Sequence, residues 1–187
     1  LAFDGVDGAG RRGAVRLYDF WEPSEDSAQL LVVLVSGGLW CGTCRWTAEH
    51  LPEIAARVDG GRISRLDVVV RDPDNAEASA DRDARPWQAA VGAHGSPVVV
   101  DPAFWLGEVL EGVRAPLPLV LVDRRTMSLE AVASNPSPEA LTTILAATLA
   151  RLDGAAPPAP REETLVDGLF HENEWAMLEA MAQVPGA

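Results

Sequence analysis

The sequence contains no lysine, and all 15 of its positively charged side chains are arginine. Schiff-base catalysis and the phosphate-binding loop of P-loop enzymes both need a lysine, so both classes of chemistry are excluded. The 28 acidic side chains bring the formal net charge to −13. Nucleic acids and anionic membrane surfaces bind clustered cations, so we expect no nucleic-acid partner.

Long apolar runs are also missing. The longest, Leu30–Val35, has the length of a strand and is far short of the roughly 20 apolar residues that span a bilayer. We therefore expect no membrane span. Apolar residues still make up 48% of the 187 positions, enough for one folded domain with an appendage.

Cysteine is scarce, because Cys41 and Cys44 are the only two. A single close pair is not a disulfide framework, so it does not settle the redox compartment. A structural zinc site needs four ligands, and His50, His94 and His171 form no paired spacing that would complete one. The sequence therefore predicts no metal and no bound cofactor.

The two cysteines form the motif Cys41-Gly-Thr-Cys44 directly after Trp40. The preceding apolar run predicts a buried strand, and apolar residues at helical spacing follow as far as Val58. A helix N-terminus stabilises a thiolate on the first sulfur, and the second sulfur can then attack a mixed disulfide. This pattern predicts thiol–disulfide exchange.

Strands and helices are expected to alternate, which predicts an α/β fold with a mixed sheet. Residues 1–12 are rich in Gly and Asp and predict an irregular entry. The proline-rich residues 154–164 predict a linker after a domain of residues 1–153, and residues 165–187 predict a helical arm. The predicted strands are 14–20, 30–35, 63–70, 97–100, 117–122 and 128–132; the predicted helices are 41–58, 85–93, 104–113 and 137–152.

Two segments resemble the signatures of the thioredoxin superfamily. LLVVLVSGGLWCGTCRWTAEHLPEIAARV is similar to its strand–Trp-Cys-x-x-Cys–helix core, and GVRAPLPLVLVDRRTMSLEAV is similar to its cis-proline strand and hairpin. The insertion between them, roughly residues 72–112, resembles the TlpA/ResA-like or redoxin-like branch. The resemblance covers about residues 14–153 and implies a thioredoxin fold with an inserted helix and strand segment.

The resemblance also implies roles for individual residues. Cys41 would be the exposed nucleophile and Cys44 the resolving cysteine, with Trp40 packed beside the pair. Leu117 and Pro118 would bind an extended substrate segment next to the sulfurs, and Pro118 would carry the cis peptide bond. Pro116 stays open as the alternative cis-proline.

The chain departs from the family pattern at four positions. Val35 replaces a buried aspartate, Glu49 replaces a helix-kinking proline, and Thr47 stands where TlpA-type proteins often have glutamate. Thr43 replaces the proline of the most reducing motif, which by family analogy implies a more oxidising couple. On helical spacing, Arg45 lies on nearly the same face as Cys41, whereas His50 points away from it.

Two other functions stay open at this point. The chain is alternatively a thioredoxin-like binding or scaffold module with a static cysteine pair, or a peroxide-reducing redoxin. The expected partners are protein thiols or disulfides and a redox partner protein, and the arm is a candidate dimer or partner contact. The resemblance favours an extracytoplasmic, bacterial setting, a removed leader is compatible with the missing first methionine, and a cytoplasmic location stays open.

Overall fold

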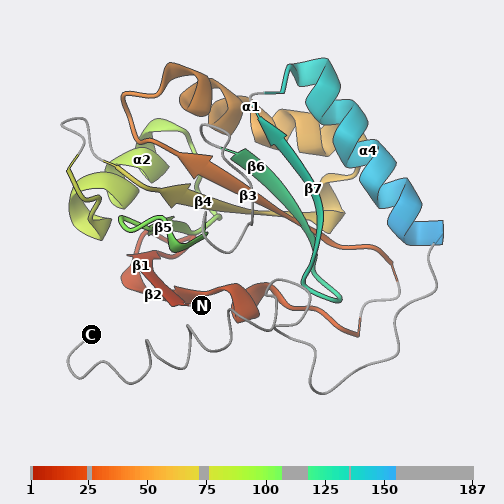
Figure 1. Ribbon diagram of the computed structural model, residues 1–187, viewed down its shortest axis with the longest axis horizontal. Helices are drawn as coiled ribbons and strands as arrows, with labels where there is room; N and C mark the ends of the chain where they lie inside the picture. The colour runs from red at the N-terminus through yellow and green to blue at the C-terminus, as the bar shows by residue number, and fades with distance from the viewer. Residues whose placement is uncertain (1, 25–26, 72–75, 107–117, 135, 155–187) are drawn as a thin grey trace.

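The computed structural model describes residues 2–24, 27–71, 76–106, 118–134 and 136–154. They form a seven-stranded mixed sheet in the order β2-β1-β5-β4-β3-β6-β7, with helices packed against it (Figure 1). The α/β fold with a mixed sheet is thereby confirmed. The strands are β1 (Ala2–Val6), β2 (Arg12–Arg16), β3 (Leu30–Ser36), β4 (Ile63–Val69), β5 (Val98–Val100), β6 (Pro118–Asp123) and β7 (Ser128–Ser134), and the helices are η1 (Leu17–Phe20), α1 (Gly42–Val58), η2 (Gly60–Arg62), η3 (Ala80–Ala84), α2 (Arg85–Ala90) and α4 (Pro138–Gly154).

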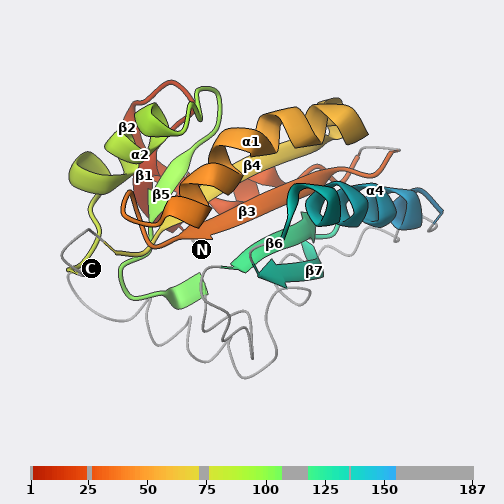
Figure 2. The same ribbon diagram turned by 90° about the horizontal axis from the view of Figure 1, so that it is seen from above.

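The central strand β3 is buried along its whole length, as its unbroken apolar run predicts. Its side chains alternate between two apolar clusters, one on each face of the sheet. Leu30, Val32 and Leu34 join the cluster beneath α1 and α4, and the intervening residues join the cluster on the opposite face. The two long helices run side by side over the first face (Figure 1, Figure 2).

The topology brings several strand ends to one edge of the sheet. β3 pairs in parallel with β4, and β4 pairs in parallel with β5, so all three strands end on the same side. β6 runs antiparallel to β3, with Leu119 opposite Leu34, and therefore begins at that same edge. The cysteines follow β3 directly, which places them at this edge beside the start of the proline-led strand.

The prediction of an irregular entry over residues 1–12 is wrong. Residues Ala2–Val6 form β1, which pairs with both β2 and β5. Gly5, which suggested a loop, instead permits close strand packing, because a Cβ there would lie 2.4 Å from the carbonyl oxygen of Val98. The strand predicted over 14–20 ends early at Arg16, and a 3-10 turn follows in which Asp19 accepts the Arg16 N–H.

The remaining predictions are confirmed in part. The helix predicted at 85–93 is α2, and a π-helical turn, η3, precedes it. The helix predicted at 104–113 lies mostly outside the described residues, as do the linker and the arm beyond Gly154. In the described part of the chain, no helix combines the length and the apolar character needed to cross a membrane.

Candidate active site

A tight loop carries the chain from β3 to the cysteines. The Ser36 hydroxyl accepts the Gly38 N–H at 3.0 Å, and the Gly38 carbonyl accepts the Cys41 N–H at 3.0 Å. Gly38 adopts a φ of 111° and a Cβ there would lie 2.5 Å from the Arg71 carbonyl oxygen, so this position requires glycine. The loop therefore fixes Cys41 at the start of α1.

Cys41 is the N-cap residue of α1. Its Sγ accepts the backbone N–H of Cys44 at 3.3 Å, and the Thr43 hydroxyl lies 3.6 Å from the same sulfur. N-cap side chains satisfy helix N–H groups that have no partner within the helix. Because the helix dipole also favours negative charge at this point, a thiolate on Cys41 would have two nearby donors and a favourable field.

The two cysteines form a disulfide, with Cα atoms 5.3 Å apart. Both residues belong to the apolar cluster beneath α1, with Cys41 7% exposed and Cys44 3% exposed. The expectation of an exposed Cys41 is therefore wrong for this oxidised form. The sulfur that caps the helix also bonds to Cys44, whose side chain faces the core.

Trp40 is the exposed aromatic beside this pair, with 55% of its surface accessible. Its ring lies against Gly37, since a Cβ on that glycine would sit 2.5 Å from the ring atom Cζ2. Trp40 thus packs on the loop that leads into the motif. Two glycines, Gly37 and Gly38, make room for it and for the turn.

The other polar residues of the first helical turns are engaged elsewhere. Arg45 forms an ion pair with Glu49 at 3.7 Å. The His50 ring stacks on Trp46 with centroids 4.3 Å apart, and its Nδ1 lies 2.8 Å from the Trp46 carbonyl oxygen. These contacts place both side chains on the surface of α1.

The structure describes only part of the expected cis-proline signature. Pro118 is the first residue of β6 and is paired with Ser134 of β7. Leu117 and Pro116 lie outside the described residues, so the two candidate cis peptide bonds stay predictions. Within the described ranges the peptide bonds are trans.

Sequence reasoning missed a buried ion pair beneath α1. Arg65 Nε donates to Asp67 Oδ1 at 2.6 Å, and Trp87 Nε1 donates to Asp67 Oδ2 at 2.7 Å. A second guanidinium nitrogen, Arg65 Nη1, donates to the Ala48 carbonyl oxygen at 2.7 Å. We call these four residues the Arg65 network; it joins α1, β4 and α2.

The proline in α1 accounts for one contact of the network, that between Arg65 and the Ala48 carbonyl. Pro52 lies inside the helix and has no N–H to donate to the carbonyl four residues earlier, which is that of Ala48. Arg65 supplies the missing donor. The sequence signal was available: two charged residues at alternate positions of a buried strand, and a proline within a predicted helix.

Val35 occupies the position at which the resembled family has a buried aspartate. Val35 packs in the apolar cluster on the face opposite the cysteines. One buried carboxylate on the cysteine side of the sheet is that of Asp67, and it is already paired with Arg65. Among the described residues, no group of three or more His, Cys, Asp or Glu side chains is placed to hold a metal ion.

No family model matches the sequence, and a search of curated proteins finds no match. Solved structures do match. A protein assigned as the thiol:disulfide interchange protein DsbE from Chlorobium tepidum shares 24% identity, with a TM-score of 0.55 over 80% of this chain and 92% of that one. A secreted thiol-disulfide isomerase from Corynebacterium glutamicum shares 20% identity, with a TM-score of 0.58 over 80% and 84%.

A thioredoxin-like protein from Aeropyrum pernix shares 14% identity, with a TM-score of 0.54 over 78% of this chain and 89% of that one. At these identities the likeness establishes the fold. The chain has the thioredoxin fold, with a Cys-x-x-Cys disulfide at the start of its first long helix.

Proposed function

We propose that the chain is a thiol–disulfide oxidoreductase that acts on protein disulfides through the Cys41–Cys44 couple. The observation that carries this proposal is the position of Cys41 at the N-cap of α1, where its sulfur accepts the Cys44 N–H. Reactive cysteines are those held as thiolates by helix N-termini and nearby donors. No bound cofactor is needed for this reaction.

In the reducing direction, the Cys41 thiolate attacks one sulfur of a substrate disulfide. A bond forms between Cys41 and that sulfur, and the other substrate sulfur leaves as a thiolate that takes a proton from solvent. The Cys44 thiolate then attacks Cys41, closes the Cys41–Cys44 disulfide and releases the second substrate thiol. A dithiol redox partner protein reduces the pair again; the oxidising direction is the reverse sequence.

Three residues are proposed to bind substrate beside the sulfurs. Trp40 offers an exposed ring on the loop before Cys41, and Pro118 begins β6 near the end of β3. Together with Leu117, Pro118 would offer an extended backbone with which a substrate segment can pair. This arrangement supports a protein substrate in an extended conformation.

An extracytoplasmic, bacterial location is part of the proposal. The similar Corynebacterium protein is described as secreted, and disulfide chemistry on proteins belongs mainly to oxidising compartments. The lysine-free composition, rich in Arg and Ala, fits a genome of high GC content.

A second candidate function is a binding module with a static disulfide. It is favoured by one observation, the burial of both cysteines in the apolar cluster beneath α1. A structural disulfide has a reduction potential below about −300 mV, whereas catalytic couples lie higher. A redox titration of the pair therefore separates the two candidates.

Direct tests follow from the mechanism. The reduced protein should catalyse the reduction of insulin by dithiothreitol, and its Cys41 should react with iodoacetamide well below the pH at which an ordinary thiol reacts. Cys44→Ser should accumulate a mixed disulfide, and Cys41→Ser should be inactive. Two ordinary thiols with no insulin reduction would exclude the oxidoreductase, and rapid peroxide consumption would indicate the redoxin alternative.

A further inference from the structure

Within the described residues, β2 and β7 are the two edge strands of the sheet. Figure 2 shows β7 outermost, beyond β6. Unpaired strand edges tend to pair with other chains, and charged side chains are one means by which proteins prevent this. β2 carries an arginine at each end, Arg12 and Arg16. β7 carries a single charged residue, Glu130.

The charge on β7 is neutralised inside the domain. Glu130 Oε2 forms an ion pair with Arg151 of α4, and Glu130 Oε1 accepts the Ser128 hydroxyl at 2.6 Å. The other side chains of the strand, whose sequence is SLEAVAS, are small or apolar, and none is proline. β7 therefore lacks the charge that protects β2.

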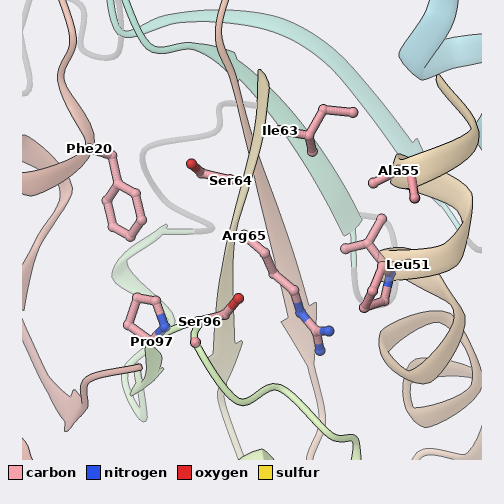
Figure 3. A pocket seen from close by; sticks show the side chains of 11 residues that line it. Phe20, Leu51, Ala55, Ile63, Ser64, Arg65, Ser96 and Pro97 are labelled. Carbon is pink, nitrogen blue, oxygen red and sulfur yellow. The ribbon is translucent and has the colours of Figure 1, made fainter. Parts of the chain in front are cut away.

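A third stretch of open edge in the described part of the chain, at the start of β4, is recessed. β5 pairs with β4 from Asp67 onward, and the residues of β4 before it lie along a cavity of about 540 Å³. In Figure 3, Leu51 and Ala55 of α1 stand on one side of β4, and Phe20 stands on the other. These side chains narrow the approach, so this stretch does not present a flat edge to another folded domain.

Leu129 and Val132 are the exposed large apolar residues of β7, with 40% and 39% of their surface accessible. Their partners on β6 are Val122 and Val120, which belong to the buried cluster on the face opposite α1. Cross-strand partners lie on the same face of a sheet. Leu129 and Val132 therefore extend this apolar cluster to the rim of the sheet.

The backbone of the same two residues faces outward. The Arg124 N–H donates to the Gln29 carbonyl next to β3 at 2.8 Å, and the two-residue period of a strand then points both valines of β6 towards β3 as well. In an antiparallel pair, opposite residues either face each other or both face away. Leu129 and Val132 therefore point their N–H and C=O groups away from β6.

A bulge gives these two residues their common direction. Leu121 is opposite Ala131 and Val122 is opposite Leu129, so Glu130 is an extra residue in β7. Two β7 strands that pair antiparallel about a two-fold axis between residues 130 and 131 place Leu129 of each strand opposite Val132 of the other. Both apolar pairs then lie on one face, and both exchange N–H···O=C bonds.

We propose that two copies of this chain associate through β7, which joins their seven-stranded sheets into one. The occupant is a second copy because β7 is complementary to itself in this register. On one face Leu129 packs against the partner's Val132, and on the other Glu130, neutralised by Arg151, lies opposite the partner's Ala131. This association is independent of the function proposed for the cysteines.

Sedimentation of the full-length protein in dithiothreitol, over about a hundredfold range of concentration, tests the proposal. We expect a monomer–dimer equilibrium that added salt strengthens, because each copy carries a net charge of −13 and salt screens the repulsion. Leu129→Arg/Val132→Arg should raise the dissociation constant of the dimer by about tenfold or more. The control Tyr18→Arg changes another exposed apolar residue and should leave the constant unchanged.

Amide hydrogen exchange of the unmodified protein, read by NMR, provides a second measurement that needs no variant. The Leu129 and Val132 amides should exchange about tenfold or more faster when dilution favours the monomer. The Ala133 amide faces β6, because its partner Leu119 faces β7, and its exchange should not change. If the double variant does not fold, this measurement decides.

A chain that stays monomeric over the whole range would overturn the proposal. So would a dimer that is equally stable in the folded Leu129→Arg/Val132→Arg variant, or one that added salt weakens. Protection of the Leu129 and Val132 amides that is independent of concentration would also overturn it, because another part of the same chain would then cover β7. Protection that rises with concentration, together with a dimer that the double variant weakens, would support it.

Discussion

At the scale of single residues, the approach to the cysteines depends on glycine at Gly38. The φ of 111° is unfavourable for a residue with a Cβ, and the nearest atom to an added Cβ is a backbone oxygen that cannot swing aside. The neighbouring motif residue Gly42 is different, because a Cβ there meets nothing within 4 Å.

Gly38→Ala should therefore lower the free energy of unfolding by about 2 kcal/mol or more. Gly42→Ala is the matched control and should change it by less than about 1 kcal/mol. Urea unfolding of both variants measures the difference. Equal stabilities would show that the loop between β3 and α1 tolerates a side chain.

Arg65 is the second residue that merits substitution. Arg65→Met removes the partner of a buried carboxylate and the donor to the Ala48 carbonyl, and should cost about 3–5 kcal/mol. Arg57→Met removes an exposed ion pair with Glu53 on α1 and should lower the free energy of unfolding by less than about 1 kcal/mol. If the two variants unfold at the same urea concentration, the Arg65 network contributes no more to the free energy of unfolding than an exposed ion pair does.

At this scale, the sequence predicts the roles of some residues and not of others. The motif and its helix identified Cys41 and Cys44, because their spacing and neighbours are local properties. The pairing of Arg65 with Asp67 is also local, but Asp67 has a further partner in Trp87, 20 residues along the chain. Local hydropathy assigns charged side chains to the surface, so it cannot anticipate such a partner.

At the scale of elements, α1 continues through Pro52, and a side chain of β4 supplies the hydrogen bond that the proline cannot make. The carbonyl of Ala48 loses its helical donor and receives a guanidinium donor in exchange. The helix that carries the cysteines is therefore attached to the sheet by a hydrogen bond as well as by apolar packing.

A double-mutant cycle tests this repair. Pro52→Ala restores an N–H that can bond to the Ala48 carbonyl. The resulting gain in free energy of unfolding should be largest in the variant that lacks the Arg65 side chain. We expect Pro52→Ala to stabilise the Arg65→Met variant by at least about 1 kcal/mol more than it stabilises the unmodified protein. Additive effects on the free energy of unfolding would contradict the exchange of donors.

The elements themselves followed from sequence where the pattern was long. β3, α1 and α4 were predicted within a few residues, because each has a sustained period or an unbroken apolar run. β1 was missed because five residues containing Asp4 and Gly5 resemble a loop. The strand is recognised by its position in the sheet, where it pairs with both β2 and β5.

At the scale of the whole molecule, Asp153 links the end of α4 to Arg62, directly before β4, and to the Ala28 N–H, shortly before β3. Hydrogen bonds from Arg62 lower the pKa of Asp153, with a smaller contribution from the Ala28 N–H. A carboxyl group with a lowered folded pKa stabilises the fold above its ordinary pKa, and this stabilisation is lost as the pH falls through the folded value.

Asp153→Asn should therefore unfold at a lower urea concentration than the unmodified protein at pH 6, and the difference should shrink as the pH falls below the ordinary pKa of an aspartate side chain. Because Asp153 is partly exposed, the difference should stay below about 1 kcal/mol. Urea midpoints of both proteins between pH 3 and pH 7 provide the measurement. A difference in urea midpoint that is constant with pH would mean that the charge on Asp153 does not contribute to stability.

The fold as a whole was accessible from sequence because two separated signatures resemble one superfamily. The order of strands across the sheet was not, since it depends on which edges meet after folding. The short pairing of β5 with β4, which covers only Asp67, Val68 and Val69 of β4, belongs to this second class of features.

The disulfide joins residues only three positions apart. A covalent link over so short a distance encloses almost none of the chain, so it restricts the unfolded polymer far less than a bridge between remote segments. The pairings that set the strand order lie between other residues. We therefore expect opening or closing of the bond to be confined to one helical turn and to leave the strand pairings unchanged.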